Sequence, residues 1–239
     1  MSLLRSAVAA SAVAVVIASS ASASTVVAGW TITTAFPTGT GNVPTGTSYS
    51  VGAADLGVST AGSNLTSVHA LAAATYTSPA GNGNQYAFSS NNWKAGDYYE
   101  ASFSTIGFSD LEVSWDQARS STGAKNFELV MSVDGGTNWI TLVADYEVLQ
   151  SGGGGAPATW STTTYNPIYS SVIALGAAAD NQSMVMLRFR ALVDAVSSTG
   201  AYAASGSVRI DNVVIMQVPA PGAIALLGVA GIVGARRRR

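Results

Sequence analysis

The sequence contains no cysteine, a single histidine and few charged residues. Without cysteine the chain cannot form disulfides, hold zinc or an iron–sulfur cluster through thiolates, or use a thiol nucleophile. One histidine excludes a metal site built from several imidazoles. Charged residues make up 10% of the 239 residues, against about a quarter in an average domain. These absences exclude thiol enzymes and the histidine- and cysteine-rich metal centres.

Basic residues are scarce everywhere except at the two ends. Of the 11 basic residues, Arg5 and four C-terminal arginines belong to the ends. The other 6 stand against 13 acidic residues, which gives residues 24–217 a net charge of −7. An acidic body repels polyanions, so we expect no nucleic-acid partner.

The N-terminal segment has the three parts of a secretory signal peptide. A basic start that ends at Arg5 precedes an apolar stretch at residues 7–18, and small residues follow. The sequence Ala-Ser-Ala at 21–23 fits the A-x-A cleavage rule. The apolar stretch is shorter than the roughly 20 residues of a membrane span, which favours a cleaved signal over an uncleaved anchor. We therefore expect residues 1–23 to direct export.

The C-terminal segment is ordered in a similar way. A proline-containing motif precedes an apolar run at residues 223–235, and a basic cluster follows. Residues 218–235 would form a helix about 27 Å long at roughly 1.5 Å per residue, close to a hydrocarbon core of about 30 Å. Clustered arginines hold their end of a membrane helix in the cytoplasm. The motif is Val218, Pro219, Ala220, Pro221 and Gly222, and the cluster is Arg236, Arg237, Arg238 and Arg239.

This tail resembles the PEP-CTERM sorting signal of Gram-negative-type bacteria. In that family a Val-Pro-x-Pro motif, an apolar transmembrane helix and an arginine cluster are recognised by a membrane protease-transpeptidase called exosortase. The resemblance covers Val218 to Arg239, and Ala220 stands where the family usually has glutamate. It implies export to the cell envelope, cell surface or extracellular matrix, with an exosortase-type enzyme as partner and the C-terminal helix in the membrane. A plain tail anchor is the alternative.

Residues between the two ends alternate apolar and polar side chains at the period of a β-strand. No part of this region shows helical periodicity, and turns rich in Gly, Asn, Ser and Pro separate the alternating segments. We predict an all-β fold, a jelly-roll-like antiparallel β-sandwich, flanked by the signal peptide and the transmembrane sorting helix. The predicted domains are 1–23, 24–217 and 218–239. Alternation is regular at residues 99–103, 110–116, 127–133, 139–146, 185–190 and 207–216, and weaker at 25–34, 48–58 and 64–70.

Three acidic residues share one face of the strand predicted at residues 110–116. They are Asp110, Glu112 and Asp116. Next neighbours on one strand face lie about 7 Å apart, which suits a calcium site or the acid and base of a glycoside hydrolase. The structural alternatives are a solvated acidic face and cross-strand pairing with Arg188 and Arg190.

The last predicted strand contains Ile210-Asp211-Asn212-Val213 and resembles the closing strand of carbohydrate-binding jelly rolls. That resemblance implies a structural calcium close to Asp211, which is the best single metal candidate of the chain. Calcium is the one cofactor that we consider. The alternative role for Asp211 is a side-chain bond that holds a loop or the first strand.

Sugar binding requires exposed aromatic rings that stack on pyranose faces. Trp93 and Trp160 lie in polar, loop-like segments and are the candidate ligand-binding residues, with packing as the alternative for Trp93. Trp115 and Trp139 lie on apolar faces and are expected in the core. Sugar binding would make an exopolysaccharide a partner.

No residue is assigned a catalytic role. The chain has no Gly-x-Ser-x-Gly elbow to supply the serine of a triad with His69. The segment from Ser132 to Trp139 resembles one copy of the Asp-box, a structural hairpin in which Asp134 bonds turn amides. We therefore predict an exported, non-enzymatic surface or matrix protein with a structural, adhesive or exopolysaccharide-associated role. The alternatives are a calcium-stabilised carbohydrate-binding module and, after it, a glycoside hydrolase.

Overall fold

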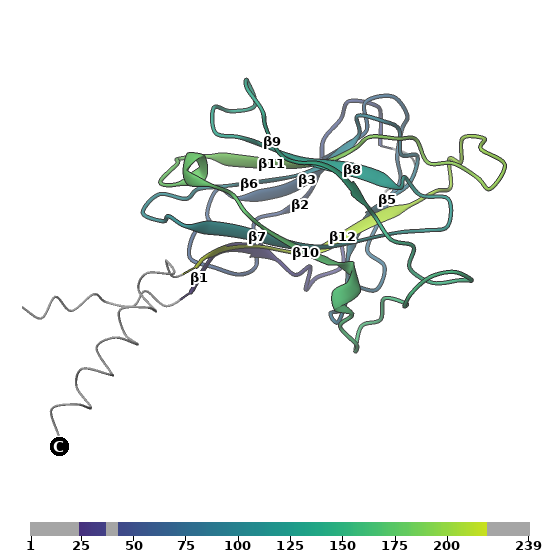
Figure 1. The fold of residues 1–239 in the computed structure, drawn as a ribbon, viewed down its shortest axis with the longest axis horizontal. Helices are drawn as coiled ribbons and strands as arrows, with labels where there is room; N and C mark the ends of the chain where they lie inside the picture. Colours follow the sequence, from purple (N-terminus) through teal and green to yellow (C-terminus); the bar gives the residue numbers. More distant parts are fainter. Residues whose placement is uncertain (1–23, 37–42, 219–239) are drawn as a thin grey trace, which may run out of the picture. The chain divides into compact units, whose positions relative to one another are not determined.

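Two antiparallel β-sheets stack face to face in the computed structural model, which describes residues 24–36 and 43–218 (Figure 1). The predicted signal peptide and the tail after Val218 lie outside the described residues. Within the described part of the chain, no helix has the length and apolar character to span a membrane. The prediction of an all-β fold with antiparallel sheets is confirmed.

The first sheet is built around β12 (Val208–Gln217). On one side β12 pairs with β7 (Leu111–Arg119), which pairs in turn with β10 (Ser170–Ala174). On the other side β12 pairs with β5 over its first residues and with β1 over its last ones. The remaining strands of this sheet are β1 (Thr25–Trp30), β5 (Phe88–Ser90) and β4 (Tyr76–Thr77), which pairs with β5.

The second sheet has β11 near its centre, paired with β6 on one side and β8 on the other. Its strand order is β2-β3-β6-β11-β8-β9. Two short 3-10 helices, η1 (Pro167–Tyr169) and η2 (Ala177–Ala179), flank β10 of the first sheet. The strands of the second sheet are β2 (Tyr49–Gly52), β3 (Asn64–Val68), β6 (Tyr98–Phe103), β11 (Val185–Ala191), β8 (Asn126–Ser132) and β9 (Ile140–Glu147).

The core lies between the sheets because alternating side chains of each strand point inward. In β11 the buried positions are Val185, Leu187, Phe189 and Ala191. The ring of Phe189 meets that of Trp115 from the first sheet, with centroids 5.3 Å apart. Burying one such side chain stabilises the fold by about 1.5–3 kcal/mol.

A second, smaller apolar cluster covers the outer face of the first sheet, the face turned away from the second sheet. Trp160 and Tyr169 pack there on Ala118 of β7 and on Ala87 beside β5. These aromatic residues come from the segment between β9 and β10, which contains four consecutive glycines at residues 152–155. This segment is therefore a covering loop and not a divider between two domains.

Candidate functional site

A bulge interrupts β12 where its neighbour changes from β5 to β1. The pairing with β7 shifts register between Asp211 and Val214, and Asn212 has a φ of 47°. Asparagine tolerates this left-handed backbone better than most residues do. Just before the bulge, Asp211 lies directly across from Asp116 of β7. Two carboxylates therefore meet on neighbouring strands.

Asparagine groups enclose these two carboxylates. Asn82 donates its backbone N–H to Asp211 (2.8 Å) and its side-chain amide to Asp116 (2.9 Å). Asn212 donates its side-chain amide to Asp116 (2.7 Å), and Asn84 donates its amide to Asp211 (3.0 Å). Asp211 and Asp116 are 0% and 2% exposed. The cluster ties β7 and β12 to the loop before β5, so Asp211 does hold a loop.

Burial raises the pKa of Asp211 to about 7, from an ordinary value of 3.8. Hydrogen bonds from Asn84, Asn82 and Asn212 oppose this shift, and the charge of Asp116 adds to it. Two carboxylates in one buried site ionise together only at a cost. A proton or a cation beside Asp211 would relieve that cost.

The oxygen atoms around Asp211 are of the kind that a hard cation such as calcium prefers. Oδ1 of Asn84 is buried without a hydrogen-bond partner among the described residues. A Cβ built on Gly81 would overlap this atom and would lie 2.6 Å from both Asp211 Oδ2 and the carbonyl oxygen of Tyr86. Three oxygens therefore converge here.

The oxygen ligands of a cation at this site would come from more than one kind of group. Among the described residues, no three side chains of Asp, Glu, His or Cys gather into a metal-binding group. Calcium would therefore be held by Asp116 and Asp211 together with amide and carbonyl oxygens, and it would act as a cross-link between β7, β12 and the loop before β5. Calcium at Asp211 stays a prediction.

Neither of the two tryptophans that were predicted to stack on a sugar has an exposed ring face. Trp93 is 0% exposed, its ring packs against Tyr99, and its Nε1 donates to the carbonyl of Ser90 (2.9 Å). Trp160 is 3% exposed and packs against Tyr169. A ring that stacks on a sugar must be open on one side. This corrects the expectation for Trp93 and Trp160, because both are packing residues in this fold.

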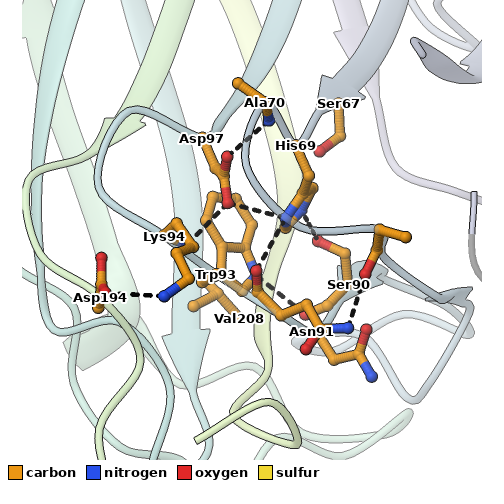
Figure 2. Close-up of polar contacts among 12 residues, drawn as sticks. Ser67, His69, Ala70, Ser90, Asn91, Trp93, Lys94, Asp97, Asp194 and Val208 are labelled. Carbon is orange, nitrogen blue, oxygen red and sulfur yellow. Dashed lines mark hydrogen bonds and ion pairs between the residues drawn. The ribbon is translucent and has the colours of Figure 1, made fainter. Parts of the chain in front are cut away.

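The single histidine connects a serine to an aspartate (Figure 2). Nδ1 of His69 lies 2.9 Å from Asp97 Oδ2, and Nε2 lies 3.0 Å from Ser90 Oγ. These distances match those of a Ser–His–Asp triad. The sequence does not reveal these partners of His69, because Ser90 and Asp97 lie in segments without a catalytic motif and only the fold brings them together.

Burial makes this cluster structural. Ser90, His69 and Asp97 are 1%, 2% and 0% exposed. The Ser90 hydroxyl also lies 3.3 Å from the Tyr99 hydroxyl, and Asp97 accepts the backbone N–H of Lys94 (2.7 Å). A catalytic serine must reach its substrate and needs oxyanion donors beside it. The three residues instead fasten the end of β3 to β5 and to the turn before β6.

The acidic face predicted on β7 is divided in the fold. Asp110 is exposed and precedes β7 with a φ of 54°, whereas Asp116 is buried in the asparagine cluster. The expected pairing of these acids with two arginines is wrong, because the arginines lie on β11 of the second sheet. The observed pairs are Arg188–Glu100 (2.5 Å) and Arg190–Glu128 (2.6 Å).

The Asp-box-like segment forms the structural turn that its sequence predicts. Asp134 Oδ1 accepts the backbone N–H groups of Thr137 (3.1 Å) and Asn138 (2.9 Å). Trp139 is half-buried and lies under the guanidinium of Arg188 (4.2 Å to the ring centroid). The expectation that Trp139 lies in the core is therefore wrong.

The predicted sorting motif is mostly outside the described residues. Val218 is described, and its backbone N–H donates to the carbonyl of Asp110 (3.0 Å). The remaining motif residues, Pro219 to Gly222, and the arginines at 236–239 lie outside.

No protein-family model and no curated protein matches the chain. Among solved structures it is similar to the carbohydrate-binding module TmCBM61 in complex with β-1,4-galactotriose, at 11% identity and a TM-score of 0.36, over 66% of this chain and 90% of that chain. It is also similar to the K1 cleaved adhesin domain of Lys-gingipain from Porphyromonas gingivalis W83, at 10% identity and a TM-score of 0.39, over 78% and 95%. It is similar as well to the K2 cleaved adhesin domain of Lys-gingipain, at 13% identity and a TM-score of 0.35, over 61% of this chain and 82% of that chain. At such values no ligand or activity is transferred to this chain.

Proposed function

We propose that this protein is an exported, non-enzymatic β-sandwich protein of the cell surface or extracellular matrix, with a structural, adhesive or exopolysaccharide-associated role. One observation supports the non-enzymatic part: the Ser90–His69–Asp97 cluster is enclosed in the core, and its polar atoms hold strands together. Export rests on the signal-like residues 1–23 and on the tail that resembles a sorting signal. A body without cysteine and with net charge −7 suits an oxidising, aqueous exterior.

Sorting is tested by the intact mass and the C-terminal peptide of the protein recovered from its native envelope and medium. We expect the mature protein to lack residues 1–23 and everything after about Pro221. Replacing the four arginines at 236–239 by serine is the control, and this variant should keep its tail. A native protein that ends in Arg239 would contradict processing and would leave a tail anchor.

The surface role is tested by co-sedimentation of the exported protein with the exopolysaccharide of its own cells. We expect the protein to sediment with the polymer, and we expect cells that lack the protein to form a weaker matrix. A protein that stays in the supernatant, together with an unchanged matrix, would contradict this role.

A calcium-stabilised carbohydrate-binding module of jelly-roll type is the second candidate, and the unpartnered Oδ1 of Asn84 beside Asp211 favours it. Calcium at one hundred times its dissociation constant would stabilise the fold by about 2.7 kcal/mol. We expect calcium, and not magnesium, to raise the melting temperature. Asp211→Asn should abolish the rise, and Asp110→Asn, at an exposed position, should keep it. An unchanged melting temperature in the wild type would contradict a calcium site.

A further inference from the structure

Arg209 differs from every other basic residue of residues 24–217 in how it is bonded. Arg119 donates to three backbone carbonyls. Arg209 makes one hydrogen bond, from Nη1 to the carbonyl of Ala80 (3.2 Å), and has no carboxylate within 4.0 Å among the described residues. The remaining four basic residues each pair with a carboxylate, in Lys94–Asp194, Lys125–Glu147, Arg188–Glu100 and Arg190–Glu128.

The position of Arg209 follows from strand register. Arg209 of β12 pairs with Ser89 of β5, and Ser89 pairs with Thr77 of β4. The residues before Arg209 and Thr77 and the residue after Ser89 are buried toward the core, so these three occupy the alternate positions on the outer face of the first sheet. A charged side chain and two hydroxyl side chains therefore lie in one row across three strands.

This row opens into a pocket of about 200 Å³. Its walls include Arg209, Thr77, Ser89 and Ser207, which directly precedes β12. The Ser89 hydroxyl donates to the carbonyl of Val208 (3.2 Å), so toward a ligand it acts as an acceptor. Hydroxyl groups both donate and accept hydrogen bonds, as sugar hydroxyls require. The volume is below the roughly 300–1,000 Å³ of sites for drug-sized ligands, so the pocket suits one sugar residue.

The guanidinium is held in place from two sides. Its carbon lies 5.2 Å from the ring centroid of Trp160, and Nη1 is bonded to Ala80. A guanidinium has five N–H donors in a planar fork, and the other four have no partner among the described residues. Two such donors bind one carboxylate in parallel. The guanidinium of Arg209 is therefore positioned to bind an anionic group.

The electrostatic surroundings of the Arg209 guanidinium also favour a bound anion. Arg209 is half-buried, and this burial lowers its pKa. Asp211 attracts the guanidinium from the next outward position of β12 without contacting it. Half-buried charges are costly unless they are paired. A carboxylate in the pocket would supply the missing pair, while the acidic body would repel longer polyanions.

We propose that the pocket around Arg209 binds an acidic sugar, with the sugar carboxylate on the guanidinium and the sugar hydroxyls on Thr77 and Ser89. This proposal rests on the proposed association with exopolysaccharide and names its chemistry, a mostly neutral polymer that carries single uronic acid residues, because the acidic body would repel a polyanion. No bond is made or broken in the site. Trp160 positions the guanidinium of Arg209 from the face of its ring.

The test is a calorimetric titration of the exported protein with glucuronate and galacturonate, and with glucose, galactose and acetate. We expect one of the two uronates to bind at least about tenfold more tightly than the matching neutral sugar and than acetate. Equal affinity for the neutral sugar would overturn the role of the charge. Equal affinity for acetate would overturn the role of the sugar.

Three variants locate the site. Arg209→Gln should weaken uronate binding at least about tenfold, whereas Lys125→Gln, which removes the same charge from an exposed pair, should leave it unchanged. Thr77→Phe should block the pocket while keeping Arg209, and it decides the question if Arg209→Gln does not fold. Unchanged uronate affinity in the folded variants would overturn the proposal. Because soluble monosaccharides are used, this result is independent of sorting and of binding to the native polymer.

Discussion

At the scale of single residues, burial decides what each pair of polar side chains contributes to stability. In the His69–Asp97 pair the side chains are 2% and 0% exposed, and in the Lys125–Glu147 pair they are 52% and 48% exposed. Removing one partner of a buried pair leaves an uncompensated polar group away from water, whereas water replaces the lost partner at the surface. The two pairs should therefore respond very differently to the same chemical change.

We expect Asp97→Asn to lower the free energy of unfolding by about 3–5 kcal/mol, because it removes the charge beside His69 and weakens the acceptor of the backbone N–H groups of Ala70 and Lys94. Glu147→Gln is the matched control and should cost about 0–1 kcal/mol. Urea unfolding curves measure both values. Equal losses of unfolding free energy in the two variants would contradict the structural role of the Ser90–His69–Asp97 cluster.

The Asp134 turn supplies a prediction about pH. Hydrogen bonds from Asn138, with that from Ser132 next, lower the pKa of Asp134 to about 2 from 3.8. A folded-state pKa below the unfolded value means that the stabilisation is present above pH 3.8 and is lost as the pH falls through about 2. NMR titration of the carboxyl carbon should show a midpoint close to 2 in the wild type and a higher midpoint in Asn138→Ala. A wild-type midpoint near 3.8 would contradict the turn geometry.

At the scale of elements, β1 is held from two sides. It pairs with β12, and the segment after β2 follows its other edge, where Gly29 N–H donates to the carbonyl of Leu56 (2.9 Å). Gly57 has a φ of 104°, and a Cβ on it would lie 2.5 Å from the carbonyl oxygen of Val27. Close contact of two backbones therefore requires glycine here.

Gly57→Ala should destabilise the protein by about 1–3 kcal/mol more than Gly52→Ala does. Gly52 has nearly the same φ, 101°, but a Cβ on it would meet no atom within 4 Å. The backbone strain is thus shared by the two variants, and only the overlap with Val27 differs. Thermal unfolding followed by circular dichroism measures the difference. Equal melting temperatures would contradict the close docking of this segment on β1.

Three short strands are the elements that the sequence pattern does not show. β4 and β5 have two and three residues, too few for an alternation to be recognised. β10 is an edge strand whose residues are mostly half-buried or exposed, so its sequence lacks a clear apolar face. Two of these strands carry Thr77 and Ser89 of the proposed sugar pocket, which explains why the pocket is invisible in the sequence.

At the scale of the whole molecule, one apolar core connects the two sheets. Residues from β1, β7 and β12 of the first sheet and from β6, β8 and β11 of the second belong to the same buried cluster. Neither sheet can keep its inner face dry without the other. The body should therefore unfold as one unit.

We expect a single calorimetric transition for the exported protein, with a calorimetric enthalpy equal to the van't Hoff enthalpy. Tryptophan fluorescence should change at the same temperature as far-ultraviolet circular dichroism, because Trp93 and Trp115 are buried in this core. Two separate transitions would show that the sheets, or the loop at residues 150–166, unfold independently.

The sequence by itself determined the features that depend on neighbours along the chain. Alternation at period two identified β6, β7, β8, β9, β11 and β12, because a strand turns successive side chains to opposite faces. The Asp134 turn was equally predictable, since its donors lie within four residues of the carboxylate. The composition of both ends predicts export and sorting in the same way, and these stay predictions.

Tertiary structure alone decided which strands became neighbours and which side chains remained accessible. It buried Trp93, brought Ser90 and Asp97 to His69, and moved the arginines of β11 away from the acids of β7. Among residues 24–36 and 43–218, it also left Arg209 without a carboxylate within 4.0 Å. The reason is physical: alternation is a property of one strand, whereas burial and charge pairing depend on residues far apart in the chain that meet only when the sheets form.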